Sequence, residues 1–344
     1  MIYTAPISAP EENESLLRLL KENELTLPQQ TDANVGLYDE GKLVGCGFLK
    51  GNMFQGIALD SAYQGEGLSV TLISALIQLA AGCGISTYQI ITKPSMARFF
   101  QGMGFRTVAD ASPYAVFLEG GAGSVRSFQQ KLRALAQDKP DGAGCVVMNC
   151  NPFTKGHRYL IEYAAKRSPW LWVLAVEEDR SEFPFRDRFA LMQEGTRDLE
   201  NVTVLPGGEY VISSKTFPSY FTKQERLASA QGAMDAAVFA QVIAPALKIG
   251  CRYVGSEPLS PVTETYNQAL LERLPKHAIA VEIVERLQNE QGIISASAVR
   301  QMLRCGQMEQ LKAFVPDCTY QYLRSGAADA VIHKLKLMNQ RSES

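Results

Sequence analysis

The sequence predicts an α/β protein of two domains, the second of which is built on a doubly wound parallel sheet. Three observations lead to this prediction. The chain has 344 residues, which corresponds to about two domains at roughly 150 residues each. Short apolar strands alternate with helical stretches along most of its length. A glycine-rich stretch at 119–124 separates a first set of strands from a second set that contains near-continuous apolar runs.

Composition and charge place the chain among ordinary globular proteins. Hydrophobic residues make up 46% and charged residues 20%, which is typical of a folded soluble domain. The 34 basic and 36 acidic side chains give a net charge of −2. This balance lacks the basic excess of nucleic-acid-binding proteins, so no nucleic-acid partner is expected.

The sequence also predicts a cytoplasmic protein without membrane attachment. No uninterrupted apolar run reaches the ~20 residues of a membrane-spanning helix. The first residues lack the basic region and the apolar core of a signal peptide. The seven cysteines are odd in number and form no C-x-x-C pair, which favours reduced thiols over disulfides or a structural zinc site. With only three histidines, mechanisms that need a histidine cluster are excluded.

The first part of the chain, residues 1–125, is predicted to form a small domain. Leucines at helical spacing indicate a helix over 11–24. Two strands joined by a turn at 39–42 follow within 34–49. Apolar patterns then predict strands at 54–59, 87–92 and 114–118, and helices at 68–82 and 95–102. A linker over 126–142, which includes a helix at 127–138, connects this domain to the rest.

The second part, residues 143–344, begins with an apolar run at 143–148 that is typical of a strand buried on both faces. Further strands are predicted at 171–176, 202–205, 252–254 and 280–284. Helices are predicted at 156–166, 186–199, 228–246, 262–273 and 297–304. Because strands and helices alternate, the sequence favours right-handed βαβ units in a doubly wound parallel sheet.

A polar segment, Asn149 to His157, stands between a predicted strand and a predicted helix. Such a junction presents unpaired backbone N–H groups and the positive end of the helix dipole, where a phosphate binds readily. Gly156 would let a ligand approach the backbone closely, and Thr154 and His157 would add a hydroxyl and a ring donor. The alternative interpretation is a helix capped by Thr154, with His157 buried and satisfied.

A second segment, Gly292 to Arg300, predicts another helix start. Either Ser295 or Ser297 can cap this helix, and Arg300 lies about one turn further along. Two hydroxyls, helix-start amides and a guanidinium would together bind phosphate. The alternative interpretation is a capped helix without a ligand.

Together these segments resemble the HxGH nucleotidyltransferase superfamily, in which T-x-G-H follows the first strand and I-S-x-S-x-x-R opens a late helix. Thr154 stands where many members have their first histidine. Longer motifs resemble citrate lyase ligase, also called acetate:SH-acyl-carrier-protein ligase: NPFTKGHRYLIE (151–162), FPFRDRF (183–189), NVTV (201–204), GSEP (255–258) and ISASAVR (294–300). The resemblance covers roughly residues 140–315.

The first domain resembles a GNAT acetyltransferase. The loop QGEGLS (64–69) is similar to the pyrophosphate-binding loop of that family, and FFQGMGF (99–105) is similar to a second GNAT motif. This resemblance implies acetyl-CoA as a ligand. Ser69, however, replaces the usual Gly or Ala and would crowd the pyrophosphate. A GNAT fold that serves as a scaffold is therefore favoured over one that binds acetyl-CoA.

The resemblance to citrate lyase ligase implies an enzyme that uses ATP and acetate. Acetate would form acetyl-AMP and release pyrophosphate. The thiol of the CoA-derived prosthetic group on the citrate lyase acyl carrier subunit would then accept the acetyl group and release AMP. Mg²⁺ would be held through the phosphates, with no metal site made by the protein. Such chemistry depends mainly on in-line positioning and on stabilisation of negative charge.

Three alternatives remain open at this point. An adenylyltransferase with a phosphopantetheine-like acceptor would need the same phosphate contacts. A GNAT acyltransferase would use acetyl-CoA and would carry the second domain for regulation. A third possibility is a protein that binds ATP only as a ligand.

The resemblance also implies site residues. Thr154, His157 and Arg300 would be catalytic. The nucleotide-binding residues would be Asn151, Phe153, Gly156, Arg180, Gly255, Glu257, Ser295 and Ser297. Among these, Gly255 and Glu257 would lie near the adenosine, and Ser295 and Ser297 near the β- and γ-phosphates. Arg188 and Lys223 are further candidates; for them and for Arg180 the alternative is a structural or solvated charge.

Overall fold

The computed structural model describes residues 1–11, 13–65, 67–177, 181–211, 224–256 and 261–342. The chain divides into two compact units, the first made of Met1–Lys131 and Ser214–Val242 and the second of Leu132–Ser213 and Ile243–Ser344. The α/β fold class predicted from the sequence is confirmed. The predicted boundaries, 1–125, 126–142 and 143–344, stay a prediction, and the structure adds that a segment from the predicted second domain groups with the first unit.

The first unit is built on a seven-stranded mixed sheet with the strand order β1-β2-β3-β4-β5-β7-β6. Its strands are β1 (Ile2–Ala5), β2 (Ala33–Asp39), β3 (Lys42–Lys50), β4 (Met53–Leu59), β5 (Thr87–Thr92), β6 (Arg106–Asp110) and β7 (Val116–Gly121). All neighbours are antiparallel except β4 and β5, which pair in parallel only at Met53 with Gln89 and at Phe54 with Ile90. Beyond these pairs the two strands separate.

Helices α1 (Glu14–Glu22), α2 (Leu68–Gly82) and α3 (Pro94–Gly102) accompany this sheet. The Asn13 side chain accepts a hydrogen bond from the Leu16 amide and so caps α1. Helix α2 packs on β2 and β3. A Cβ at Gly47 of β3 would lie 2.7 Å from a methyl group of Leu76, so glycine at this position allows the helix to approach the sheet closely.

Helix α7 (Gln224–Val238) completes the first unit although it follows the first three strands of the second unit in the sequence. It packs on β6, and the π-helical turn Phe239–Ile243 continues it. The Gln241 side chain accepts from the Asp110 amide at 3.1 Å and donates to its carbonyl at 3.0 Å. These contacts explain why this segment groups with the first unit.

One described stretch, Leu227–Leu247, is long and apolar enough to cross a membrane by length and composition, but 72% of its most apolar window is buried inside the protein. It therefore has the character of a core helix. The sequence analysis predicted a helix over 228–246 but recognised no membrane-length apolar run here, because Gln231, Asp235 and Gln241 interrupt it.

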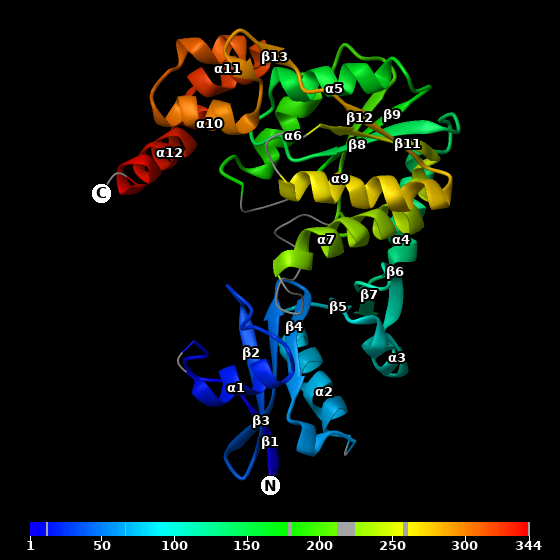
Figure 1. Cartoon of the computed structure of the whole chain (residues 1–344), viewed down its shortest axis with the longest axis vertical. Helices are drawn as coiled ribbons and strands as arrows, with labels where there is room; N and C mark the ends of the chain where they lie inside the picture. Colours follow the sequence, from blue (N-terminus) through cyan, green and yellow to red (C-terminus); the bar gives the residue numbers. More distant parts are fainter. Residues whose placement is uncertain (12, 66, 178–180, 212–223, 257–260, 343–344) are drawn as a thin grey trace. The chain divides into compact units, whose positions relative to one another are not determined.

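The second unit contains a five-stranded sheet with the order β10-β9-β8-β11-β12, in which all neighbours are parallel. The strands are β8 (Ala143–Met148), β9 (Leu171–Ala175), β10 (Val202–Pro206), β11 (Ile249–Gly255) and β12 (Ala280–Val284). Helix α5 (Lys155–Ala165) lies on one side of the strands and α9 (Pro261–Arg273) on the other (Figure 1). Helices on both faces make this the predicted doubly wound sheet.

The remaining helices of the second unit are α6 (Phe185–Glu194), which packs on β10, and α8 (Ala244–Leu247), which packs on β11. A short hairpin of β13 (Gln288–Asn289) and β14 (Gly292–Ile293) leads into α10 (Ala296–Arg304), α11 (Asp317–Arg324) and α12 (Asp329–Ser342). These last helices share a core of buried residues that includes Val299, Leu303, Leu311 and Phe314, together with Phe183 from the loop after β9.

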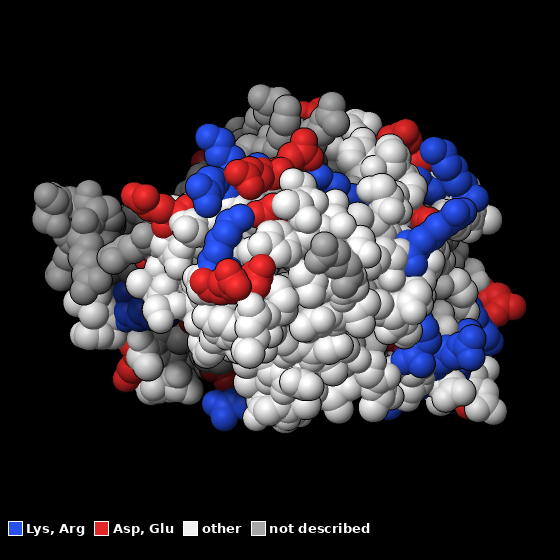
Figure 2. Space-filling view, turned by 90° about the horizontal axis from the view of Figure 1, so that it is seen from below, with Lys and Arg blue, Asp and Glu red and all other residues white. Residues whose placement is uncertain are grey.

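Charged side chains are mixed on the face shown in Figure 2. Lys and Arg form small groups, several of them beside Asp and Glu, and a broad area carries uncharged residues. This distribution agrees with the near balance of charges in the sequence.

Candidate active site

The candidate site lies at the switch point of the parallel sheet. From β8 the chain builds outward through β9 and β10 on one side, and then through β11 and β12 on the other. The carboxyl ends of β8 and β11 therefore flank the point where the strand order reverses, which is where open α/β sheets bind their ligands. The segment Asn149–His157 follows β8, and Gly255 ends β11.

The end of β11 is open. Among the described residues, no atom lies within 4 Å of where a Cβ at Gly255 would be, and the Asn267 side chain donates to the Gly255 carbonyl at 3.2 Å. Three other candidates from the sequence, Arg180, Lys223 and Glu257, lie outside the described residues.

Thr154 and His157 form a reciprocal cap at the start of α5. The Thr154 hydroxyl accepts from the His157 amide at 3.3 Å, and the Nδ1 atom of His157 accepts from the Thr154 amide at 3.0 Å. This is the geometry of a capping box, with histidine in the place of the usual Glu or Gln. The capping interpretation of Thr154 is thus what the structure shows, and the same bonds fix the orientation of the imidazole ring.

The His157 imidazole is held neutral. Burial of the ring lowers its pKa to about 4, and the nearby positive charge of Arg286 lowers it further in the same direction. Because Nδ1 accepts a backbone hydrogen bond, the proton of the neutral ring is assigned to Nε2. His157 therefore offers one N–H donor at neutral pH and carries no charge.

Arg300 joins the two segments that the sequence analysis singled out. Its Nη1 atom donates to the Asn151 carbonyl at 2.5 Å, and its Nη2 atom donates to the Ser297 hydroxyl at 3.2 Å. Asn151 lies three residues before the Thr154 cap, so the guanidinium stands at the loop that leads into α5. Segments almost 150 residues apart in the sequence thus meet at one helix start.

Gly156 makes this meeting possible. A Cβ at this position would lie 2.6 Å from the Ile294 carbonyl oxygen, a distance that a side chain does not tolerate. The sequence analysis expected Gly156 to leave room for a ligand; in the structure the room is taken by the backbone that precedes α10. The Lys155 amide also donates to the Phe314 carbonyl at 2.9 Å, which adds a further contact with the C-terminal helices.

Of the two serines that could cap α10, Ser295 does so. Its hydroxyl accepts from the Ala298 amide at 3.1 Å. The side chain of Ser297 is exposed and its hydroxyl accepts from Arg300. The two hydroxyls therefore have different local roles, one at the helix start and one on the guanidinium.

The side chains of Asn151 and Phe153 hold the loop and the His157 ring in place through contacts inside the protein. The Asn151 side chain accepts from the Phe183 amide at 3.0 Å and donates to the Glu182 carboxylate. Phe153 is fully buried, and its ring stacks on the His157 ring with their centroids 6.0 Å apart. Both side chains, which the resemblance assigned to the nucleotide, are engaged within the protein.

Arg188 is a buried structural cation. Its guanidinium donates to the carbonyls of Asn149, Val176 and Phe183 at 2.5, 3.1 and 3.1 Å. It thereby connects the loops that follow β8 and β9 beneath the site. These contacts correspond to the structural alternative that the sequence analysis gave for this residue.

Two charged residues of the site were missed by the sequence analysis. Arg286 follows β12, donates to the Ser256 carbonyl at 2.7 Å, and is close enough to lower the pKa of His157. Burial also lowers the pKa of Arg286 itself. Glu182 pairs with Arg300, with 3.6 Å between Oε1 and Nε. Their place in the sequence could have identified both residues, because each follows the carboxyl end of a predicted strand in a parallel sheet, where ligands bind.

The described residues include no group of three or more His, Cys, Asp or Glu side chains placed to hold a metal ion.

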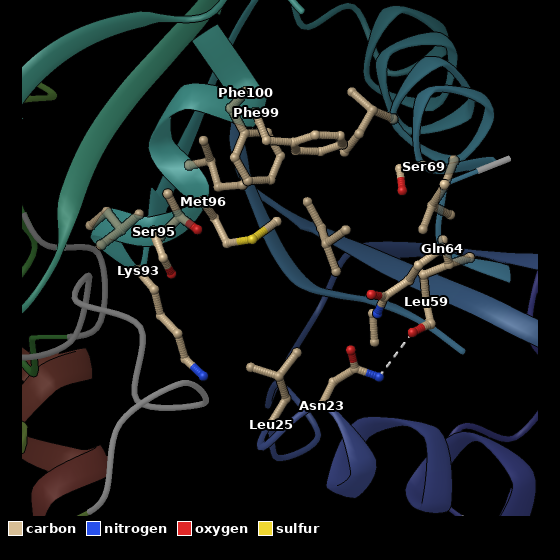
Figure 3. Close-up of a pocket in the computed structure, with 18 residues that line it drawn as sticks. Asn23, Leu25, Leu59, Gln64, Ser69, Lys93, Ser95, Met96, Phe99 and Phe100 are labelled. Atoms are coloured by element: carbon tan, nitrogen blue, oxygen red, sulfur yellow. Dashed lines mark hydrogen bonds between the residues drawn. The ribbon is translucent and has the colours of Figure 1, made fainter. Parts of the chain in front are cut away.

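A separate cavity of about 590 Å³ lies in the first unit, where β4 and β5 separate. Figure 3 shows Lys93, Ser95 and Met96 on one side of it, and Gln64 and Ser69 of the predicted GNAT loop on the other. The lining is mostly apolar and includes Phe99 and Phe100. Among the described lining residues Lys93 is the one titratable side chain, and it pairs with Glu24 at 2.7 Å.

Comparisons with known proteins identify a family for each of two consecutive parts of the chain. The description "Citrate lyase ligase C-terminal domain" matches residues 143–323, and "Acetyltransferase (GNAT) domain" matches residues 8–115. A [citrate [pro-3S]-lyase] ligase from Klebsiella pneumoniae is 38% identical over 90% of this chain and 92% of its own length. Ligases of the same name from Escherichia coli (strain K12) and Haemophilus influenzae are 36% and 38% identical, over 90% and 92% of this chain and 90% and 97% of their own lengths.

Among solved structures, a GNAT family acetyltransferase from Elizabethkingia anophelis with acetyl-CoA bound is 15% identical to this chain. The match covers 35% of this chain and 98% of that protein, with a TM-score of 0.28.

Proposed function

The chain belongs to the citrate lyase ligase family, and from this premise we propose that it activates acetate with ATP and transfers the acetyl group to a thiol of citrate lyase. It is an enzyme of the ligase class, as its relatives are. The acceptor in this proposal is the CoA-derived prosthetic group on the acyl carrier subunit. Because the reaction consumes ATP, we place it in the cytoplasm.

One observation carries the proposal. The Arg300 guanidinium contacts the Asn151 carbonyl in the loop that leads into α5, at the switch point of the sheet, and the neutral His157 ring stands in the first turn of that helix. A guanidinium, an uncharged N–H donor and a helix start together form an environment for a polyphosphate.

In the first half-reaction, a carboxylate oxygen of acetate attacks the α-phosphorus of ATP. The bond between the α-phosphorus and the bridging oxygen breaks, and pyrophosphate leaves with the electron pair. Acetyl-AMP is the other product. Arg300 would stabilise the negative charge that grows on the leaving pyrophosphate, and the Nε2–H of His157 would donate to a phosphate oxygen. Thr154 would act by holding the ring in this orientation.

In the second half-reaction, the carrier thiol attacks the acetyl carbon of the mixed anhydride. The thioester forms, AMP leaves, and the thiol proton is released. Here the protein contributes position, since the anhydride already supplies a good leaving group. Mg²⁺ bound through the phosphates would neutralise part of their charge in the first half-reaction. Gly255, at the open end of β11, would lie near the adenosine.

Exchange of labelled pyrophosphate into ATP tests the first half-reaction. We expect exchange that depends on acetate and needs no carrier, and acetyl-AMP detectable by mass spectrometry in the same mixture. Exchange without acetate would instead support an adenylyltransferase with another acceptor. A folded protein that gives neither exchange nor acetyl-AMP would contradict the proposal.

For the first unit we propose a scaffold role without acetyl transfer of its own. The cavity between β4 and β5 has the size of a ligand site, but its described lining offers no carboxylate, histidine or thiol to act as a general base. Incubation with acetyl-CoA and the carrier, in the absence of ATP, tests this role. We expect no acetylated carrier, and its appearance would assign acyltransferase activity to this unit.

A further inference from the structure

The loop after β9 carries a carboxylate that reaches the phosphate-binding arginine. Glu182 accepts a hydrogen bond from the Asn151 side chain through Oε2, and its Oε1 atom lies 3.6 Å from the Arg300 Nε. Its neighbours are also fixed: the Ser181 hydroxyl accepts from the Asn149 side chain at 3.0 Å, and the Phe183 amide donates to Asn151 at 3.0 Å. The carboxylate is therefore held on a loop that two asparagines attach to the end of β8.

The three contacts of Arg300 occupy different edges of its guanidinium. Nε faces Glu182, Nη1 donates to the Asn151 carbonyl, and Nη2 donates to the Ser297 hydroxyl. A guanidinium has five N–H groups, so these contacts leave one on each Nη atom for another acceptor. The group is thus oriented by the protein while two donors stay available for phosphate oxygens.

The ion pair between Arg300 and Glu182 is partly shielded from solvent. The side chains of Arg300 and Glu182 are 20% and 24% exposed, so solvent and salt screen their attraction less than that of a fully exposed pair. A flexible arginine loses conformational freedom when it binds an anion. A carboxylate that already fixes its Nε edge removes part of this cost.

We propose that Glu182 is a positioning residue for ATP binding: it holds the Arg300 guanidinium, together with the loop before α5, in the orientation that receives the β- and γ-phosphates. This inference rests on the function proposed above for the same site. Glu182 acts through Arg300 and does not itself contact the substrate. Its negative charge is compatible with an anion site because it is paired with the positive charge of the Arg300 guanidinium.

The substitution Glu182→Gln tests the inference, since it keeps the shape of the side chain and removes its charge. The matched control is Glu162→Gln, which breaks another partly buried pair in the same unit, between Glu162 and Arg158 at 2.6 Å, with side chains 37% and 20% exposed. Calorimetric binding of ATP, KM values in the exchange reaction and the unfolding midpoint are measured for each variant.

We expect Glu182→Gln to weaken ATP binding about tenfold, a size typical of one charge-assisted contact, while the KM for acetate stays unchanged. Glu162→Gln should lower the unfolding midpoint at least as much and leave ATP binding unchanged. In an Arg300→Gln background, Glu182→Gln should cause no further loss of affinity.

ATP binding that is unchanged or tighter in Glu182→Gln would overturn the inference, because the carboxylate would then be a bystander or a competitor of the phosphates. Additive losses in the double variant would show that Glu182 acts independently of Arg300, which also overturns it. Absence of acetate-dependent exchange in the unaltered protein would contradict the proposed function alone, since ATP binding is measured without acetate.

Discussion

At the scale of single residues, the site is assembled from side chains that hold one another. Thr154 and His157 form reciprocal hydrogen bonds, and Phe153 stacks on the imidazole ring. The Asn151 side chain forms hydrogen bonds with the Glu182 carboxylate and the Phe183 amide. In the proposed mechanism, Arg300 and the Nε2 atom of His157 are therefore the groups that would meet a phosphate. The sequence pattern predicted that the segments around Thr154 and Arg300 come together, and they do; it could not predict which side chains contact one another, and the roles assigned to these residues stay a prediction.

The interaction between Arg286 and His157 can be tested directly. Burial is the main cause of the low pKa of His157, and the charge of Arg286 adds to it. We expect Arg286→Gln to raise the pKa of His157 while leaving it below the ordinary value of about 6.5, because the burial remains. Titration of the imidazole by NMR measures this shift. A pKa that stays at its original value would show that the two residues do not interact.

The same pKa predicts a pH dependence of stability. In the unfolded chain His157 has a pKa near 6.5, and in the folded protein its pKa is about 4. The neutral form therefore favours folding, and this contribution is fully present above the unfolded pKa. It is lost as the pH falls from 6.5 towards 4, because the unfolded state binds the proton more readily.

We expect a His157→Asn variant to lose less unfolding free energy than the unaltered protein over that pH range, as measured by denaturant titration. Parallel losses in the two proteins would contradict the assigned pKa.

Gly156 provides a residue-scale test of the meeting between the two segments. In Gly156→Ala the new methyl group would lie 2.6 Å from the Ile294 carbonyl, so either α5 or the segment before α10 must shift. We expect weaker ATP binding and a lower unfolding midpoint. Gly326→Ala is a matched control in the same unit, because its Cβ would meet only the Asp329 carboxylate at 3.8 Å. Equal midpoints for the two variants would show that the close approach is not required.

At the scale of elements, the start of α5 allows the effect of a helix cap on stability to be tested together with the proposed ATP binding. The Thr154 hydroxyl caps the helix and contacts the His157 ring, with 2.9 Å between Oγ1 and Nδ1. Thr154→Val keeps the shape of the side chain and removes the cap, which is typically worth about 1 kcal/mol. We expect that loss of unfolding free energy together with weaker ATP binding.

Thr154→Ser retains the hydroxyl and serves as the control. Calorimetry of ATP binding and denaturant unfolding report the two effects separately. If Thr154→Val loses stability but binds ATP as before, Thr154 acts only as a helix cap and has no role in ATP binding.

Most elements were predictable because their periodicity is strong. The apolar runs at β8 and β9 gave buried parallel strands, and the helix after each strand followed from its spacing. The short strands β1 and β6 were missed: three of the four residues of β1 are exposed, so it shows no alternation of buried and exposed positions. The leucines that predicted α1 do not all lie on its buried side: Leu17 is 40% exposed, because four leucines in five positions cannot all face one sheet.

At the scale of the whole molecule, the sequence predicted two domains but not which segments of the chain belong to each compact unit. Nothing in α7 reveals that it packs on β6, since contacts between distant segments leave no local signal. The convergence of the loop after β8 with the start of α10 is equally non-local. It was expected only because motifs on both segments resemble one family, and the contact partners Ile294, Glu182 and Arg286 were found only in the structure.

The two units should be separable in function. Ser69 lines the cavity of the first unit and is only partly buried, so Ser69→Trp can obstruct the cavity without entering the core. We expect acetate-dependent pyrophosphate exchange to be unchanged in this variant. Circular dichroism confirms that the variant is folded. Loss of exchange in a folded Ser69→Trp protein would mean that the cavity takes part in the first half-reaction.

The chain passes between its two units three times, near residues 131, 213 and 242. No single break in the polypeptide can therefore release one intact unit from the other. A protease that nicks the connection near residue 131 would leave α7 attached to the wrong fragment, and a gene truncated there would encode a sheet without its closing helix. An interleaved architecture of this kind also means that neither unit can be removed whole by deleting one end of the chain.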